Sequence, residues 1–481
     1  MSQATRSPVT TPSSGRAPTR AGAGWLVAVA ATVAAIVVAI VVGGLLSQLV
    51  HPFLRHDDWQ AVLPQGAPGS TAHVARNRYE GRWLNTVYWF VVGQRAPLSV
   101  AMAVFVAGYA AFVAGLVRLL RLRVAPSVFL ATLALLVSPV WVRLAYWPGT
   151  LSAAMLVAGA AVWTLPWARR RHVTLGLWLV GSVVASVLSY PPVALLLLLA
   201  LALCELAAPV RRLVLLAGGF VAAYGLGVLL TFALNALAFG QFGVTISAWR
   251  RPNPLRSPEA LVTNVGRYLA QLEALGSSLG WAWVVGAVGL VVAVAGRSTR
   301  RSALVVLGAV GVVVALEGGL TVVTGVVAGE RASLWAWPAI CLPIALLLKG
   351  IRPMRRFAAG ALAIVAALGL AAWRADLGDH QTTRQQYDAI VDETAQLAAD
   401  HPGQRVVLWM EPRWRVTVQG SMTAVTLRSM LYVERGLNPR WCRPVECDLI
   451  AHDVARHPSA ASARRVDGMT VMLVPSPPPW L

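Results

Sequence analysis

The stretch "WLVAVAATVAAIVVAIVVGGLLSQLV" (Trp25–Val50), followed directly by "HPFLRHDDWQ" (His51–Gln60), determines the class of this protein. A helix of about 20 apolar residues is long enough to cross the ~30 Å hydrocarbon core of a bilayer, so the first stretch predicts a membrane span. The second stretch then places two adjacent carboxylates, Asp57 and Asp58, where the chain leaves the membrane.

The composition of the whole chain indicates a polytopic membrane protein. The chain is 57% hydrophobic and only 13% charged, which is far from the composition of a soluble domain. Apolar runs of sufficient length predict about eleven transmembrane helices and therefore an all-α membrane fold. After the first run, they extend from Pro97 to Leu116, Ser127 to Trp147, Thr150 to Trp167, Val173 to Tyr190, Pro192 to Ala207, Leu213 to Phe239, Leu279 to Ala295, Leu304 to Ala328, Leu334 to Leu348 and Phe357 to Trp373. An odd number of crossings places the two termini on opposite sides.

The basic residues indicate how the chain is oriented. The net charge is +21, nearly all of it from arginine, since Lys349 is the only lysine. With a cytoplasmic N-terminus, every basic cluster in a short loop lies inside, as the positive-inside rule requires. These clusters are Arg118, Arg121 and Arg123; Arg169, Arg170 and Arg171; Arg211 and Arg212; Arg297, Arg300 and Arg301; and Lys349, Arg352, Arg355 and Arg356. The basic charge therefore reflects topology, and no nucleic-acid partner is expected.

The charge pattern and the hydropathy together predict the domain organisation. Residues 1–24 form a disordered cytoplasmic tail, 25–373 a transmembrane domain, and 374–481 an extracytoplasmic C-terminal domain. Two long outer loops are expected at 51–96 and 240–278. Because the arginine- and alanine-rich usage is typical of a high-GC bacterial genome, the expected location is the plasma (inner) membrane, crossed many times.

The segment after the last span predicts a small α/β domain. The helical patterns "YDAIVDETAQLAAD" and "TAVTLRSMLYVERG" alternate with the strand-like "RVVLWM" and "MTVMLVP". In an oxidising outer compartment Cys442 and Cys447 are expected to form a disulfide bond, the alternative being two free thiols. Cys204 and Cys341 lie inside apolar runs and are expected to be small core residues.

The aspartate pair has three interpretations: solvated surface charge, a helix cap with a first-turn acid, or a functional acid pair. We favour function, because the predicted outer loops contain few other acids and this pair lies next to the lipid headgroups. A carboxylate there can accept the proton of an attacking hydroxyl, as expected of Asp57 or Asp58. Alternatively, Asp58 binds a divalent cation, Mg²⁺ or Mn²⁺, that neutralises a phosphate leaving group. No other cofactor is indicated.

Departure of a lipid phosphate also requires cationic donors, and several arginines are predicted on the same face. They are Arg82, Arg143, Arg250, Arg251 and Arg331. Arg143 lies in "SPVWVRLAYWPG", inside the outer end of a span, where an unpaired charge is expensive. The alternative for Arg143 is that its side chain extends along the lipid to the membrane surface.

An acidic pair in the first outer loop, followed by "YEGRWLNTVYW" on about eleven spans, resembles the GT-C class of membrane glycosyltransferases. More narrowly, the pattern looks like the GtrII-type glucosyltransferase family. The resemblance implies that Asp57 and Asp58 are the catalytic motif and that Gly81 and Arg82 are the Gly-Arg element. It also implies a polyprenyl-phosphate sugar as donor and an envelope glycan or lipid as acceptor. The expected substrate-binding residues are Tyr79, Glu80, Arg82, Arg143, Tyr146, Tyr190, Arg250, Arg251 and Arg331, with Tyr190 in the similar "LSYPP" element.

Two other functions remain open. A polysaccharide polymerase or ligase would use the same donor on the same face, with "SAWRRPNPLRSPEA" in the second outer loop as its arginine-rich segment. A lipid or sugar transporter (flippase) would need polar groups at mid-depth, where Glu317 and Asn235 are the main candidates. No inverted repeat is visible, which disfavours the transporter.

Overall fold

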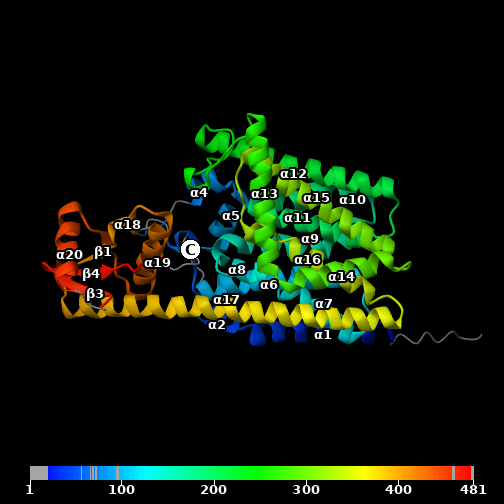
Figure 1. Ribbon diagram of the computed structural model, residues 1–481, viewed down its shortest axis with the longest axis horizontal. Coiled ribbons are helices and arrows are strands. Elements are labelled where there is room, and N and C mark those ends of the chain that lie inside the picture. Colours follow the sequence, from blue (N-terminus) through cyan, green and yellow to red (C-terminus); the bar gives the residue numbers. More distant parts are fainter. Residues whose placement is uncertain are drawn as a thin grey trace, which may run out of the picture.

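The computed structural model describes residues 20–55, 57–64, 67, 70, 73–93, 97–457 and 461–477, and within these the protein is mostly helical with a small C-terminal sheet (Figure 1). The predicted tail, 1–24, lies largely outside the described residues. Its last residues belong to helix α1 (Arg20–Gly43), so the first helix begins before the apolar run does.

In the described part of the chain, seven helices are long and apolar enough to cross a membrane. They are α1, α6 (Leu98–Leu120), α9 (Pro148–Ala168), α10 (His172–Ser189), α12 (Val210–Phe239), α15 (Arg300–Thr324) and α17 (Arg352–Asp400). The pair α13 (Pro258–Leu279) and α14 (Trp281–Ala295), bent by 97°, makes an eighth if it counts as one span. The chain is therefore a multi-pass membrane protein, as predicted.

The expected number of about eleven included three helices that are too short to qualify. These are α7 (Ala125–Leu136), α11 (Pro191–Cys204) and α16 (Ala336–Leu347), which are 12 or 14 residues long. At 1.5 Å per residue such helices extend about 18–21 Å, less than the hydrocarbon thickness. All three are largely buried in the bundle, and hydropathy alone does not distinguish a buried apolar helix from a span.

The helices of the bundle approach closely at small residues. A Cβ atom at Gly108 of α6 would lie 2.8 Å from the backbone of Met155 in α9, and one at Gly115 would lie 2.6 Å from Val162. Glycine at these positions lets the two backbones pack directly, which is how helices commonly associate in lipid. Helices α6 and α9 thus form a closely packed pair.

One end of the bundle carries several short helices. They are α2 (Leu46–Val50), α3 (Asp57–Val62), α4 (His73–Glu80), α5 (Trp83–Tyr88), the π-helix η1 (Trp89–Gly93), α8 (Pro139–Leu144), and the 3₁₀ turns η2 (Ala248–Arg250) and η3 (Glu330–Ala332). The second predicted outer loop, 240–278, is mostly helix, because α13 occupies its second half. In Figure 1 α13 crosses the other bundle helices at a steep angle.

Helix α17 joins the bundle to the C-terminal domain (Figure 1). It is 49 residues long, which corresponds to about 73 Å and exceeds any bilayer. The predicted domain boundary at 373/374 falls inside this continuous helix. Trp373 is buried there and donates a hydrogen bond to the Ser138 carbonyl over 2.7 Å.

The described C-terminal residues form a mixed four-stranded sheet in the order β2-β1-β4-β3. Its strands are β1 (Arg405–Trp409), β2 (Arg440–Trp441), β3 (Ala463–Val466) and β4 (Met469–Leu473), and its helices are α18 (Pro412–Arg415), α19 (Val418–Arg435) and α20 (Pro444–Arg456). Strand β1 is parallel to β2 and β4, whereas β3 is antiparallel to β4. The predicted α/β domain is present, although β2, β3 and α20 were not foreseen.

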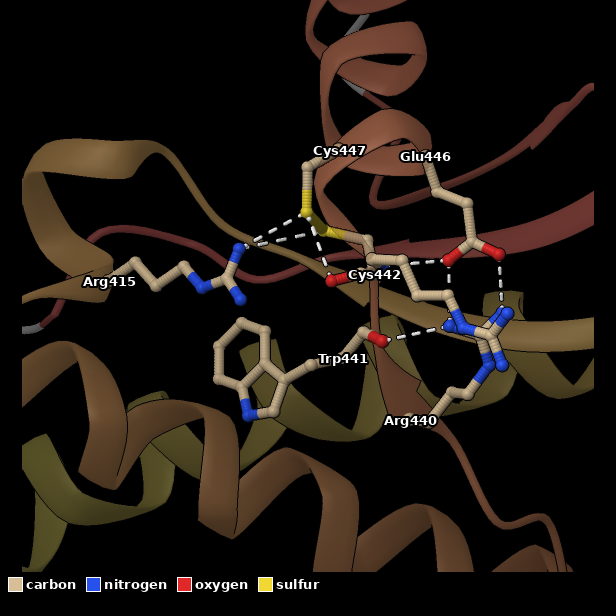
Figure 2. The surroundings of a disulfide bond; sticks show 7 residues. Arg415, Arg440, Trp441, Cys442, Glu446 and Cys447 are labelled. Carbon is tan, nitrogen blue, oxygen red and sulfur yellow. Dashed lines mark hydrogen bonds and ion pairs between the residues drawn. A yellow bond between two sulfur atoms is a disulfide. The ribbon is translucent and has the colours of Figure 1, made fainter.

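Cys442 and Cys447 form the expected disulfide bond, which links β2 to the first turn of α20 (Figure 2). Arg415 points at this bond from α18 and lies 3.1 Å from the Cys447 sulfur. Beside it, Arg440 binds Glu446 through two hydrogen bonds, one of 2.7 Å. The bonds from Arg440 lower the pKa of Glu446 to about 2.

The first loop is built into the hydrophobic core of the C-terminal domain. Phe53, Leu54 and Trp59 are buried in one cluster with residues of α17, β1 and α19, among them Tyr387 and Leu427. Burial of large aromatic surface is a strong and non-directional stabilising term. The loop that carries the aspartate pair and the C-terminal domain therefore pack together at the same end of the helical bundle.

Candidate functional site

Asp58 is fully buried and binds the N-terminus of α9. The backbone N–H groups of Gly149 and Thr150 each donate a 2.8 Å hydrogen bond to its carboxylate. A negative charge at this position satisfies two N–H groups that the helix leaves unpaired and interacts favourably with the helix dipole. Asp58 thus caps a helix, as one of the alternatives foresaw, but the helix is distant in sequence rather than its own.

The second half of the first loop binds the same two residues. The Asn85 side-chain amide donates to the Thr150 carbonyl, and the Trp89 indole donates to the Gly149 carbonyl, each over 2.7 Å. No larger residue fits at Gly149, because a Cβ atom would lie 2.7 Å from Val62. The turn before α9, "YWPGT", is therefore the docking point for the whole loop, a role that sequence reasoning missed.

Asp57 is the first residue of α3, and its side chain lies outside the described part of the structure. The helix behind it is fixed on two sides, by Asp58 against α9 and by Trp59, whose indole donates to the Leu54 carbonyl over 2.9 Å. Helix α3 also contacts α19 of the C-terminal domain. The backbone of Asp57 is consequently held at the junction of the bundle and the C-terminal domain.

Three arginines, which we call the arginine cluster, surround the dipeptide Tyr146–Trp147. The guanidinium of Arg55 lies 4.4 Å from the Tyr146 ring centre, and that of Arg331 lies 4.6 Å from a ring of Trp147. The third member, Arg143, precedes the dipeptide in sequence. Burial lowers the pKa of Arg55, and the positive charges of Arg143 and Arg331 act in the same direction. Tyr146 and the carboxylate of Asp376 oppose this lowering of the Arg55 pKa.

Arg143 is paired with protein carboxylates and is not free in the membrane. It lies 2.9 Å from Glu330 and 3.5 Å from Asp376. Asp376 also accepts a 2.6 Å hydrogen bond from the buried Tyr146 hydroxyl. The ring of Tyr146 stacks on His380 at 3.7 Å. Both Arg143 and Tyr146 were expected to bind substrate, yet their polar atoms are engaged in holding α8 against α17.

Arg331 differs from Arg143 in its surroundings. Its side chain is exposed, it rests on the Trp147 ring, and it forms no ion pair with any described residue. A guanidinium that lies over an aromatic ring keeps its N–H donors available for another partner. Of the predicted phosphate-binding arginines, Arg331 is the one best placed to receive an anion.

The predicted Gly-Arg element lies in the turn between α4 and α5 and packs against α12 and Tyr190. Gly81 has a φ of +67°, and a Cβ atom there would collide with Thr231 of α12. Arg82 pairs with Glu80 at 3.3 Å and lies 4.9 Å from the Tyr190 ring centre. Glu80 also pairs with Arg76 at 3.3 Å, so its charge is neutralised. Tyr79, another predicted substrate-binding residue, lies in α4 just before this turn, and its side chain is 51% exposed.

Asn235 fastens this turn to α12. Its amide donates to the Asn77 and Gly243 carbonyls over 3.0 and 2.7 Å, and its oxygen accepts from the Trp83 indole over 2.9 Å. This polar residue of a span was a candidate transport group in the sequence. Its full set of hydrogen bonds gives it a structural role.

Arg250 and Arg251 belong to a different surface. Arg250 rests on Trp249 at 5.1 Å, and the Arg251 carbonyl accepts a 2.9 Å hydrogen bond from Arg267 of α13. The described contacts tie this segment to α4 and α13, through bonds such as that from Thr245 to the Arg78 carbonyl. These two arginines are not brought together with the arginine cluster.

Glu317, the second candidate for transport, anchors the segment that carries Arg331. Its buried carboxylate accepts hydrogen bonds from Gln271 at 2.9 Å, from the Ser333 hydroxyl at 2.6 Å and from the Trp335 indole. A charge buried in a bundle is tolerated when donors surround it in this way. Ser333 directly follows η3, so the carboxylate fixes the position of Arg331.

A cavity of about 390 Å³ opens between α3 and the C-terminal domain. Gln60 of α3 lines one side, and Arg415, Thr417 and Ser421 line the other. These side chains offer both donors and acceptors for a hydroxyl-rich molecule. The cavity lies beside the helix that begins with Asp57.

The described residues contain no group of three or more His, Cys, Asp or Glu side chains that could hold a metal ion. The carboxylate of Asp57 is outside this set, and both oxygens of Asp58 already accept backbone N–H groups. Comparison with known proteins assigns no family to this chain. No protein-family model, no curated protein and no solved structure matches this chain.

Proposed function

We propose that this protein is a GT-C-like membrane glycosyltransferase that resembles the GtrII type. It would move a sugar from a polyprenyl-phosphate donor to an envelope glycan or lipid on the outer face of the plasma membrane. The observation that carries the proposal is the arginine cluster, which lies on the Tyr146–Trp147 turn at the same end of the bundle as α3. Helix α3, which begins with Asp57, and the exposed guanidinium of Arg331 lie at this end, and a base together with a cationic donor suits the departure of a lipid phosphate.

The proposed topology has eleven crossings. Eight are the long or bent spans, and three are α7, α11 and α16, which are shorter than the hydrocarbon core but cross it buried among the longer helices. It places the N-terminus in the cytoplasm and the C-terminal domain outside. Supporting this, α9 begins at the Asp58 contact and ends next to Arg169, so this basic cluster lies at the opposite end of the bundle. Arg169 and Arg212 both approach Glu205, which brings two of the basic loops together at that end.

In the proposed reaction Asp57 is the general base. It takes the proton of the acceptor hydroxyl while that oxygen bonds to the anomeric carbon of the sugar. The bond from the anomeric carbon to the phosphate oxygen breaks, and polyprenyl phosphate leaves with the bonding electrons. Arg331 stabilises the phosphate charge, with Arg55 behind it. Asp58 holds α3 on α9 and takes no part in proton transfer.

The acceptor would enter through the cavity between α3 and α19. Its lining is polar in part: Gln60, Thr417 and Ser421 can bind the hydroxyl groups of a glycan, and apolar residues such as Val418 and Met422 can pack against the sugar ring. A divalent cation, Mg²⁺ or Mn²⁺, is compatible with this scheme only if Asp57 and the donor phosphate hold it. The two oxygens of Asp58 are already occupied by backbone N–H groups.

Lipid and glycan profiling of a strain that lacks the protein tests the proposal. We expect one glycosyl substituent to disappear from the envelope and polyprenyl-phosphate sugar to accumulate, with both changes reversed by the wild-type chain. Loss of a polymerase would instead shorten a polysaccharide without removing a substituent. An unchanged glycan and lipid profile contradicts the proposal.

A further inference from the structure

A groove lies in the bundle between α11, α12 and α15, with a volume of about 640 Å³. Leu198 and Leu201 of α11 form its buried floor. Its walls are apolar side chains that face outward, such as Val214 of α12, which is 64% exposed, and Leu304 of α15, which is 46% exposed. The groove is thus a hydrophobic recess between helices of the membrane bundle.

The mouth of the groove is positively charged. Arg297, Arg300 and Arg301 line it, and Arg301 donates to the carbonyls of Ala207 and Ala208 over 3.0 and 2.7 Å. Arg297 and Arg300 form no ion pair with any described residue. The one acid in the lining, Glu205, is already paired with Arg212 at 3.0 Å. The mouth therefore carries uncompensated positive charge.

This groove is remote from the arginine cluster. Helix α15 begins with Arg300 at the mouth and runs 25 residues to Thr324, before the chain reaches Arg331. A helix of that length extends about 37 Å, so the mouth lies at the other boundary of the bilayer.

We propose that this groove binds an anionic phospholipid of the bilayer. An acyl chain lies along the α11 floor, and the phosphate contacts Arg297 and Arg300. Both halves of such a lipid are matched, because the recess is apolar and its mouth is cationic. Basic pockets between transmembrane helices recognise anionic headgroups by this chemistry. The site is separate from glycosyl transfer and does not depend on it.

The charged half of the proposal is tested by native mass spectrometry of the full chain in mild detergent. The protein is titrated with phosphatidylglycerol or with phosphatidylcholine. We expect wild-type protein to prefer phosphatidylglycerol, and each arginine removed to weaken this binding roughly fivefold. The double variant Arg297→Gln, Arg300→Gln should therefore lose about 25-fold. The control Arg352→Gln, Arg356→Gln, in another basic cluster, should bind as wild type does.

The apolar half is tested by filling the groove. Gly308 of α15 lines it and has open space where a Cβ would be, so Gly308→Phe blocks the recess without a clash or a change of charge. Gly319→Phe is the matched control, since it lies on the same helix, also in open space, but beyond the groove. Gly308→Phe should abolish retention of phosphatidylglycerol, and Gly319→Phe should not. Wild-type retention in both Gly308→Phe and the arginine double variant overturns the proposal.

Discussion

Asp58 has a structural role that its own sequence neighbours do not reveal. Asp58 is buried, and its partners, Gly149 and Thr150, are more than 90 positions away in sequence. Nothing in the letters "DDW" indicates that contact, so a cap, a base and a metal ligand were all reasonable interpretations. The described geometry assigns Asp58 to helix capping, and the proposed reaction therefore uses Asp57 as the base.

Replacement of Asp58 should affect stability more than catalysis. Asp58→Asn retains the size but turns an NH₂ group toward one of the two backbone donors, at a cost of about 1.5–3 kcal/mol. We expect a clearly lower unfolding temperature in detergent, with transfer per folded molecule close to wild type. Asp379→Asn, at an exposed position of α17, is the control and should unfold normally. An Asp58→Asn protein that is fully stable but inactive would contradict this assignment.

Replacement of Arg331 should affect use of the donor. A charge-assisted hydrogen bond to phosphate is typically strong enough that Arg331→Gln should raise the donor KM about tenfold to a hundredfold. The matched control is Arg250→Gln, because Arg250 also rests on a tryptophan but lies outside the arginine cluster. The donor KM of each variant is obtained from initial rates measured over a range of donor concentrations. Equal KM values in the two variants would remove Arg331 from the donor site.

At the scale of secondary-structure elements, a single carboxylate positions the segment around η3. Glu317→Gln replaces an acceptor of three hydrogen bonds with a group that can accept only through one oxygen. We expect faster hydrogen exchange in residues 329–335 and a higher donor KM, while the rest of the bundle is unchanged. Glu273→Gln, at an exposed glutamate of α13, should change neither quantity. Unaltered exchange at 329–335 would show that other contacts hold the segment.

The helices themselves were largely predictable from sequence, and their ends were not. Hydropathy located the apolar helices, because each is a long run of apolar residues, whether it faces lipid or the interior of the bundle. It could not show that α17 continues past Trp373, since the helix changes from an apolar to an amphipathic pattern there without a break. It also could not show that α13 fills most of the second loop. Capping contacts between distant residues, such as that of Asp58, leave no local pattern at all.

At the scale of the whole molecule, the first loop and the C-terminal domain share a core. Labelling of single cysteines with an impermeant reagent tests how this arrangement sits in the membrane. Asp400→Cys, at the end of α17, should react in intact cells. Ser298→Cys, between α14 and α15, should react only after permeabilisation. Reaction of both positions from the same side would mean that the chain crosses the membrane an even number of times between them. That result would exclude the proposed topology, which requires an odd number.

The central claim is that the α3 end of the bundle performs glycosyl transfer with Asp57 as its base. The most direct measurement is the transfer rate of membranes that contain Asp57→Asn, supplied with polyprenyl-phosphate sugar and the native acceptor. Loss of a general base typically lowers a rate about 10²-fold to 10⁴-fold, and we expect a fall of that size with normal insertion and unfolding temperature. Asp379→Asn membranes, assayed in parallel, should retain the wild-type rate. A wild-type rate with Asp57→Asn would contradict the account and leave the glycosyltransferase assignment resting on hydropathy alone.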